Sequence, residues 1–261
     1  KQGTAVAQKL VDSKVNGVVG HLNSGTTIPA SAVYNQCGIP HVTPSATNPK
    51  LTQQGFKTSF RLLANDNALG AGLAFYAADA LKLKKVAIID DRTAYGQGVA
   101  EVFKRTAQQK GLQVVDEQFT TDKATDFMAI LTAIKSKNPD AIFFGGMDPQ
   151  AGPMLRQMEQ LGMGNVKYFG GDGICTSEIA KLAGGAKTVC LRHLGVNEVA
   201  ELLLDIGVKA SCSDRRNEAH LIECIEPVVH FLHMVEHEAP SERGIFRRDS
   251  HDHHWGRCRR G

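Results

Sequence analysis

Short apolar runs rich in β-branched or aromatic residues alternate with segments of helical periodicity along residues 1–188. This alternation is typical of a parallel sheet wound with helices. We expect an α/β fold with buried central strands at 17–20, 85–89, 113–115, 141–144 and 166–169. Between them, apolar residues at three- and four-residue spacing predict surface helices at 4–13, 24–35, 67–83, 96–110, 127–137 and 150–161.

Polar or glycine-rich segments follow most of these strands. The segment 40–58 has no sustained period, and its prolines Pro44 and Pro49 bracket small polar residues, so we predict a loop after a short strand at 39–42. Such loops lie at the carboxyl edge of a parallel sheet, where open α/β folds bind ligands. Ser24, which opens a helix at the same edge, suits an N-cap as well as it suits ligand contact.

The helix predicted at 67–83 links two groups of strands. The simplest layout therefore has two α/β lobes, one at 1–65 and the other at 66–188. A crevice between lobes is a usual place for a small ligand.

The composition changes abruptly near residue 188. Residues 1–188 hold 16 Lys, 4 Arg, 2 His and 2 Cys, whereas residues 189–261 hold 1 Lys, 9 Arg, 8 His and 4 Cys. The histidines and cysteines of 189–261 allow a metal-binding tail. We favour an atypical tail produced by out-of-frame translation, because a selected metal site would space its ligands more tightly. We expect no metal site.

Several function classes are disfavoured. The formal charge of +3 is too small for a nucleic-acid footprint, no apolar run approaches the ~18 residues of a membrane span, and Lys1 is not followed by an apolar signal core. The sequence holds no dinucleotide fingerprint, P-loop, HExxH or GxSxG motif. His21 could act as a base for Ser24, but no acidic partner is close in sequence, so we interpret it as a structural imidazole.

The remaining polar residues suit a site that holds a zwitterion without transforming it. Ser24, Thr47 and nearby backbone amides can donate to a carboxylate, and Asp172 can accept from an ammonium group. A solvated turn aspartate is an equal interpretation of Asp172 from its local sequence. We expect no cofactor.

The chain resembles the periplasmic branched-chain amino-acid-binding proteins, the Leu/Ile/Val receptors of ABC importers. The resemblance covers residues 1–187 and is carried by four motifs, which are 18–27 (VVGHLNSGTT), 43–52 (TPSATNPKLT), 91–100 with Tyr95-Gly96-Gln97-Gly98, and 126–146. It implies a type I periplasmic-binding fold whose two Rossmann-like lobes close on an aliphatic L-amino acid, without catalysis.

The resemblance also implies site residues, partners and a location. Carried over position by position, the carboxylate donors fall on Ser24 and Thr47, with backbone contacts at Ser45 and Ala46. The second-lobe contacts fall on Tyr95, on Met147, where relatives often have an aromatic, and on Asp172 as the ammonium partner. The implied protein is periplasmic, monomeric and served by a membrane permease.

The chain departs from the family pattern at both ends. Relatives begin with a strand, a helix and a second strand before the segment that matches Lys1, and the match stops after Lys187, so we expect an incomplete first lobe. Two alternatives remain open, an amino-acid- or amide-sensing regulatory domain on the same fold and a crevice enzyme that uses His21 and Ser24. A fused output domain would indicate the former, and turnover of amino-acid amides or esters the latter.

Overall fold

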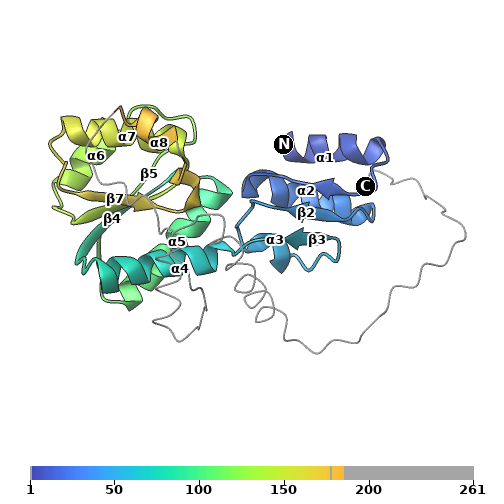
Figure 1. Ribbon diagram of the computed structural model, residues 1–261, viewed down its shortest axis with the longest axis horizontal. Coiled ribbons are helices and arrows are strands. Elements are labelled where there is room, and N and C mark those ends of the chain that lie inside the picture. Colours follow the sequence, from blue (N-terminus) through green and yellow to red (C-terminus); the bar gives the residue numbers. More distant parts are fainter. Residues whose placement is uncertain (1, 177, 185–261) are drawn as a thin grey trace, which may run out of the picture.

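The computed structural model describes residues 2–176 and 178–184, and the tail predicted at 189–261 lies outside these residues. The described part holds two separate parallel sheets (Figure 1). The N-terminal sheet has the order β1-β2-β3, and the C-terminal sheet has the order β5-β4-β6-β7. The parallel pairing confirms the α/β prediction.

The N-terminal sheet is small. Its strands are β1 (Val18–Val19), β2 (His41–Thr43) and β3 (Ser59–Arg61). The helices of this part are α1 (Gln2–Asp12), α2 (Ser24–Gln36) and the short α3 (Lys50–Gln53). One core cluster joins Ala7 of α1, Ala30 and Tyr34 of α2, and Ile39.

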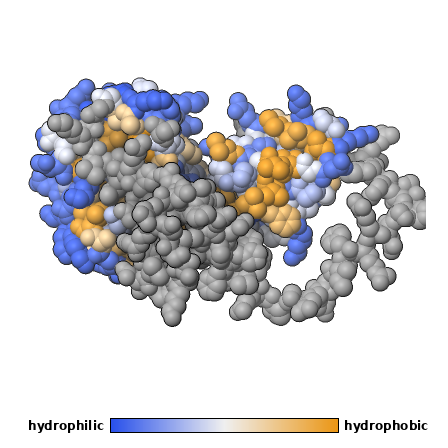
Figure 2. Space-filling model, in the orientation of Figure 1, coloured by the Kyte–Doolittle hydropathy of each residue, from blue (hydrophilic) through white to orange (hydrophobic). Residues whose placement is uncertain are grey.

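The register of this sheet separates two faces. Val19 pairs with Val42, and Val42 with Phe60, so these three side chains share one face. Val19 is 81% exposed and Phe60 is 51% exposed, and Figure 2 shows apolar side chains gathered over this part of the molecule. The prediction of a buried central strand at 17–20 is therefore wrong, because Val19 is exposed and β1 lies at the edge of the sheet that the described residues form.

The C-terminal sheet has helices on both faces. Its strands are β4 (Lys85–Asp90), β5 (Gln113–Phe119), β6 (Ala141–Gly145) and β7 (Lys167–Gly170). The helices are α4 (Asp66–Phe75), continued by the π-turn η1 (Tyr76–Ala80), α5 (Ala94–Gln109), α6 (Met128–Lys135), α7 (Asp148–Gln160) and α8 (Glu178–Leu182).

Alternation along the strands explains this layering. Val86, Ile88 and Phe143 point to a core formed with α4 and α5. Ile89 and Phe144, on the opposite face, point to a second core formed with α6 and α7. β4 and β6 are buried central strands as predicted. The prediction of central strands at 113–115 and 166–169 is wrong, because β5 and β7 lie at the edges of the sheet that the described residues form.

The α-helix in the segment 67–83 is shorter than predicted. α4 stops at Phe75, the π-turn follows, and Lys82 takes a positive φ of 53° that ends the helical segment. The strand β3 lies just beyond the predicted loop, and the sequence pattern does not predict it. No helix among the described residues is both long enough and apolar enough to cross a membrane.

Candidate ligand-binding site

Two loops meet at the carboxyl edge of the N-terminal sheet. Thr43 Oγ1 donates to the carbonyl oxygen of His21 at 2.8 Å and accepts from the backbone N–H of Ala46 at 3.0 Å and of Ser45 at 3.3 Å. Ser24 Oγ accepts from the backbone N–H of Asn48 at 3.1 Å. These bonds fold the loop after β2 onto the start of α2.

The four predicted residues on this side therefore lie together. Ser24, Ala46 and Thr47 are buried and Ser45 is half-buried. The N-cap of α2 is Asn23, so of the two interpretations of Ser24 the structure does not support capping, and the Ser24 hydroxyl binds the loop after β2. Thr47 Oγ1 is buried and makes no hydrogen bond of normal geometry.

The predicted residues of the C-terminal sheet also lie together. Tyr95 Oη donates to Asp172 Oδ1 at 2.8 Å and accepts from the backbone N–H of Gly173 at 2.9 Å. Burial raises the pKa of Tyr95 well above its ordinary value, and the Asp172 charge acts in the same direction, so the phenol stays a donor. Asp172 is thus held by a side chain rather than left as a free turn aspartate.

Gly173 makes this packing possible. A Cβ at Gly173 would lie 2.8 Å from Met147 Sδ and 2.9 Å from the Tyr95 ring. A side chain there would displace one of them. Met147, the N-cap residue of α7, therefore borders the same group as Tyr95 and Asp172.

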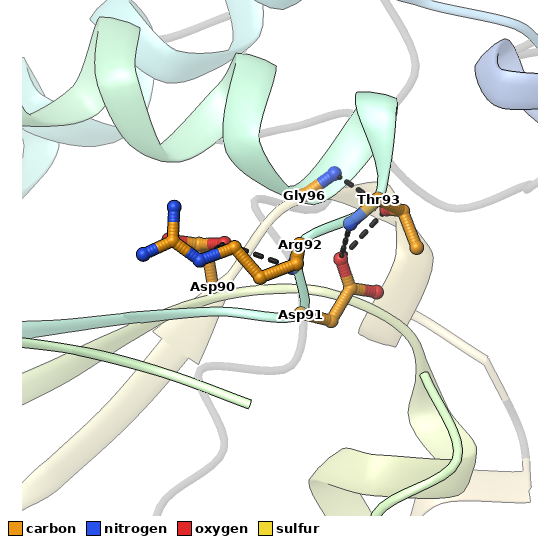
Figure 3. Close-up of polar contacts among 5 residues, drawn as sticks. All are labelled: Asp90, Asp91, Arg92, Thr93 and Gly96. Carbon is orange, nitrogen blue, oxygen red and sulfur yellow. Dashed lines mark hydrogen bonds and ion pairs between the residues drawn. The ribbon is translucent and has the colours of Figure 1, made fainter. Parts of the chain in front are cut away.

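Hydrogen bonds in the turn before α5 fix the start of this helix (Figure 3), and Tyr95 is the second residue of α5. Asp91 Oδ1 accepts from the backbone N–H of Thr93 at 2.9 Å and from its hydroxyl at 2.6 Å. Thr93 Oγ1, in turn, accepts from the backbone N–H of Gly96 at 3.0 Å, which caps the helix. Burial raises the pKa of Asp91, and its bonds to Thr93 act against that rise.

Two residues that the sequence analysis did not single out connect the two groups. Asn48 Nδ2 donates to the carbonyl oxygen of Ala94 at 2.6 Å, and the backbone N–H of Asp66 donates to the carbonyl oxygen of Thr47 at 2.9 Å. A Cβ at Gly98 would lie 2.7 Å from Asn48 Nδ2 and 2.8 Å from Asp66 Oδ2. α5 therefore packs directly against the loop of the N-terminal sheet.

The cavity of about 590 Å³ beside this junction is a different feature. Residues of α5 line it together with the segment 48–53, and its lining is mostly charged or amide side chains, among them Asn48, Lys50, Asn67, Arg92, Glu101 and Lys104. None of the seven predicted site residues lines it. We therefore place the candidate site at the two residue groups and not in this cavity.

His21 is engaged away from Ser24. Its Nε2 lies 2.9 Å from Tyr34 Oη, and the rings of His21, Tyr34 and His41 have centroids 5.1 to 6.0 Å apart. Burial lowers the pKa of both histidines. Among the described residues no hydrogen bond joins His21 to Ser24, which supports the structural interpretation of His21.

Comparison with known proteins decides the family. The model of the periplasmic binding protein family matches residues 1–190. The chain belongs to this family. The chain is 40% identical over 190 residues to an amino acid binding protein of Pseudomonas aeruginosa, a match that covers 72% of this chain and 50% of that protein. It is 39% identical over 195 residues to Leu/Ile/Val-binding protein homolog 1 of Brucella abortus, covering 75% of this chain and 52% of that protein.

Solved structures give the same result for the fold. The leucine binding protein LivK of Thermotoga maritima matches with a TM-score of 0.69 and 27% identity, covering 79% of this chain and 62% of that chain. The isoleucine complex of LivJ from Streptococcus pneumoniae matches with a TM-score of 0.64 and 32% identity, covering 69% of this chain and 51% of that chain. The fold is thus the predicted type I periplasmic-binding fold. The chain spans about half the length of the curated relatives it matches.

Proposed function

We propose that this periplasmic binding protein is the substrate-binding component of an ABC importer and captures a branched-chain or similar aliphatic L-amino acid. The ligand would lie between the loops of the N-terminal and C-terminal sheets, with residues 1–65 and 66–188 as the two lobes. The protein would act in the periplasm as a monomer without catalysis, and a membrane permease would receive the ligand. The names of the relatives from Pseudomonas and Brucella support this class of ligand.

The observation that carries the proposal is the Tyr95–Asp172 pair. A carboxylate held at 2.8 Å by a buried phenol is a fixed anion that can accept from an ammonium group. On the opposite side, Ser24 Oγ accepts from the backbone N–H of Asn48 and keeps its own proton to donate. Thr47 Oγ1 is buried and makes no hydrogen bond of normal geometry, and the side chain near it is that of Asp66. These hydroxyls suit a ligand carboxylate.

Ser45 and Ala46 would contribute through their carbonyl oxygens. Their backbone N–H groups already point at Thr43 Oγ1. Met147, next to Gly173, would supply an apolar wall for the ligand side chain. The proposed site thus contains donors for a carboxylate, an acceptor for an ammonium group and an apolar contact.

Calorimetry with L-leucine, L-isoleucine and L-valine tests the function. A charge-assisted hydrogen bond contributes about 1.5–3 kcal/mol, so Asp172→Ala should weaken binding roughly ten- to over a hundredfold. Thr47→Val should weaken it less, because a neutral hydroxyl is one of several donors. Asp79→Ala serves as the control. Asp79 is an exposed residue of the π-turn η1 that forms an ion pair with Lys110, so this variant should bind the amino acids like the wild type.

Two results would contradict the proposal. Failure of the wild-type chain to bind any of the three amino acids would remove the proposed ligand class. Unchanged affinity in Asp172→Ala would remove Asp172 from the site.

A further inference from the structure

Asn48 is a buried residue whose polar atoms are all engaged. It is 6% exposed. Its backbone N–H donates to Ser24 Oγ at 3.1 Å, and its carbonyl oxygen accepts from Arg61 Nη1 at 3.4 Å. In the side chain, Oδ1 accepts from the backbone N–H of Lys50 at 2.9 Å, and Nδ2 donates to the carbonyl oxygen of Ala94 at 2.6 Å. The amide therefore needs an acceptor at one end and a donor at the other, which asparagine supplies and the isosteric aspartate does not.

The partners of Asn48 belong to the two parts of the chain that carry different sheets. Ser24 opens α2 beside the N-terminal sheet, whereas Ala94 opens α5 beside the C-terminal sheet. The backbone of α5 lies against Asn48, since a Cβ at Gly98 would be 2.7 Å from Asn48 Nδ2. The start of α2 also approaches α5, because a Cβ at Gly25 would be 3.9 Å from Ala94 Cβ. Asn48 thus bridges the two parts where α2 and α5 begin.

Each end of this bridge reaches one half of the proposed site. At the N-terminal end, Asn48 binds the hydroxyl of Ser24, a proposed donor to the ligand carboxylate. At the C-terminal end, Ala94 directly precedes Tyr95, whose Oη donates to Asp172 Oδ1 at 2.8 Å. Short, direct bonds therefore connect the group proposed for the carboxylate with the group proposed for the ammonium. Such a connection limits how far apart the two groups can lie.

We propose that Asn48 is a positioning residue that sets the spacing between the two halves of the site and thereby selects α-amino acids over β-amino acids. This inference rests on the proposed function and adds a determinant of its specificity. In a β-amino acid, one further carbon separates the ammonium group from the carboxylate. The two halves would have to move apart to hold both ends of this longer ligand, and the 2.6 Å bond between Asn48 Nδ2 and the Ala94 carbonyl oxygen opposes that movement.

Two substitutions break this bond from opposite sides. Asn48→Ser leaves a hydroxyl that can still accept from the backbone N–H two residues on, but the shorter side chain does not reach Ala94. Gly98→Ala keeps Asn48 and places a Cβ 2.7 Å from its Nδ2, which forces the amide away from Ala94. Each has a matched control. Asn67→Ser replaces an exposed asparagine of α4, and Gly72→Ala adds a methyl group that meets nothing within 4 Å.

Competition calorimetry compares L-leucine with L-β-homoleucine, which has the same side chain and ammonium group and one additional methylene before the carboxylate. The wild type should bind L-leucine more tightly. In Asn48→Ser and Gly98→Ala the affinity for L-leucine should fall roughly two- to tenfold, as expected for the loss of one hydrogen bond. The affinity for L-β-homoleucine should stay unchanged or rise. The ratio of the two affinities therefore falls in both variants, whereas both controls should keep the wild-type ratio.

This ratio separates positioning from general damage, because a disrupted loop weakens the binding of both ligands alike. An unchanged ratio in either Asn48→Ser or Gly98→Ala, or a wild type that binds both ligands equally well, would overturn the role of Asn48 and leave the proposed function standing. Absence of binding of L-leucine, L-isoleucine and L-valine by the wild type would overturn the proposed function and this inference with it.

Discussion

Asp66 makes the stability of the ligand-free protein depend on pH in a definite direction. Its folded pKa of about 6 lies above the ordinary value of 3.8, so the folded state binds the proton more tightly than the unfolded state. The stabilising contribution is complete below about pH 4 and is lost as the pH rises through 6. A shift of this size corresponds to roughly 2–3 kcal/mol.

Asp66→Asn removes this dependence. Urea unfolding of wild type and variant at pH 4 and pH 7.5, without ligand, should show the stability of the wild type relative to the variant falling by roughly 2–3 kcal/mol at the higher pH. The groups other than Asp66 that titrate, among them His21 and His41, are present in both proteins. Their contribution to the pH dependence therefore cancels when the stability of the variant is subtracted from that of the wild type. A difference that stays constant between the two pH values would contradict the raised pKa of the Asp66 carboxylate.

The sequence could indicate some residues of the candidate site but not others. Ser24, Thr47 and Asp172 stand at strand ends with side chains of suitable chemistry, and Tyr95 was found through a family motif. Asp66 carries no comparable signal, because an aspartate in the first turn of a helix is ordinary. Its burial depends on the contact with Gly98, 32 residues away in sequence, which no local pattern reports.

The elements that local patterns identify best are those of the C-terminal sheet. β4 and β6 are continuous apolar runs that are covered on both faces, so their burial could be predicted. β3 has the sequence Ser59-Phe60-Arg61 with a single apolar residue, and its strand conformation comes from pairing with β2 rather than from its own pattern. The apolar residues of β1 do not show that it pairs with β2 on one side only, so its edge position could not be predicted from its own sequence.

The contact between α4 and α5 depends on Gly70. A Cβ there would lie 2.9 Å from Val102 Cβ, 2.9 Å from the carbonyl oxygen of Val99 and 3.0 Å from the backbone nitrogen of Phe103. Gly70→Ala should therefore destabilise the protein by about 1–3 kcal/mol through forced separation of the helices. Urea unfolding measures this change.

Gly72 in the same helix is the matched control. A Cβ at Gly72 meets nothing within 4 Å, so Gly72→Ala should stabilise the protein by about 0.5–1 kcal/mol because alanine favours the helix. The two substitutions are chemically identical and are predicted to have opposite signs. Equal effects would mean that α4 does not pack against α5 at Gly70.

At the scale of the whole molecule, the two sheets differ in how they are covered. Helices pack on both faces of the C-terminal sheet. In the N-terminal sheet, no helix within residues 2–176 and 178–184 covers the face of Val19 and Phe60, and Leu62 just beyond β3 is 59% exposed. A parallel sheet needs burial on both faces for full stability, so residues 1–65 should open at a lower free energy than the C-terminal sheet.

Limited proteolysis should reveal this difference. With thermolysin and mass spectrometry, the first cuts among the described residues should fall within 1–65, and the most persistent fragment should contain residues 66–184, because cleavage follows the population of locally open states. L-leucine at saturating concentration should slow the early cuts, since a ligand that contacts both sheets stabilises the form in which the N-terminal loops are folded. A persistent fragment that keeps 1–65 while the chain is cut between β4 and β7 would contradict the predicted order of cleavage. Equal cleavage rates with and without L-leucine would mean that the N-terminal loops take no part in binding.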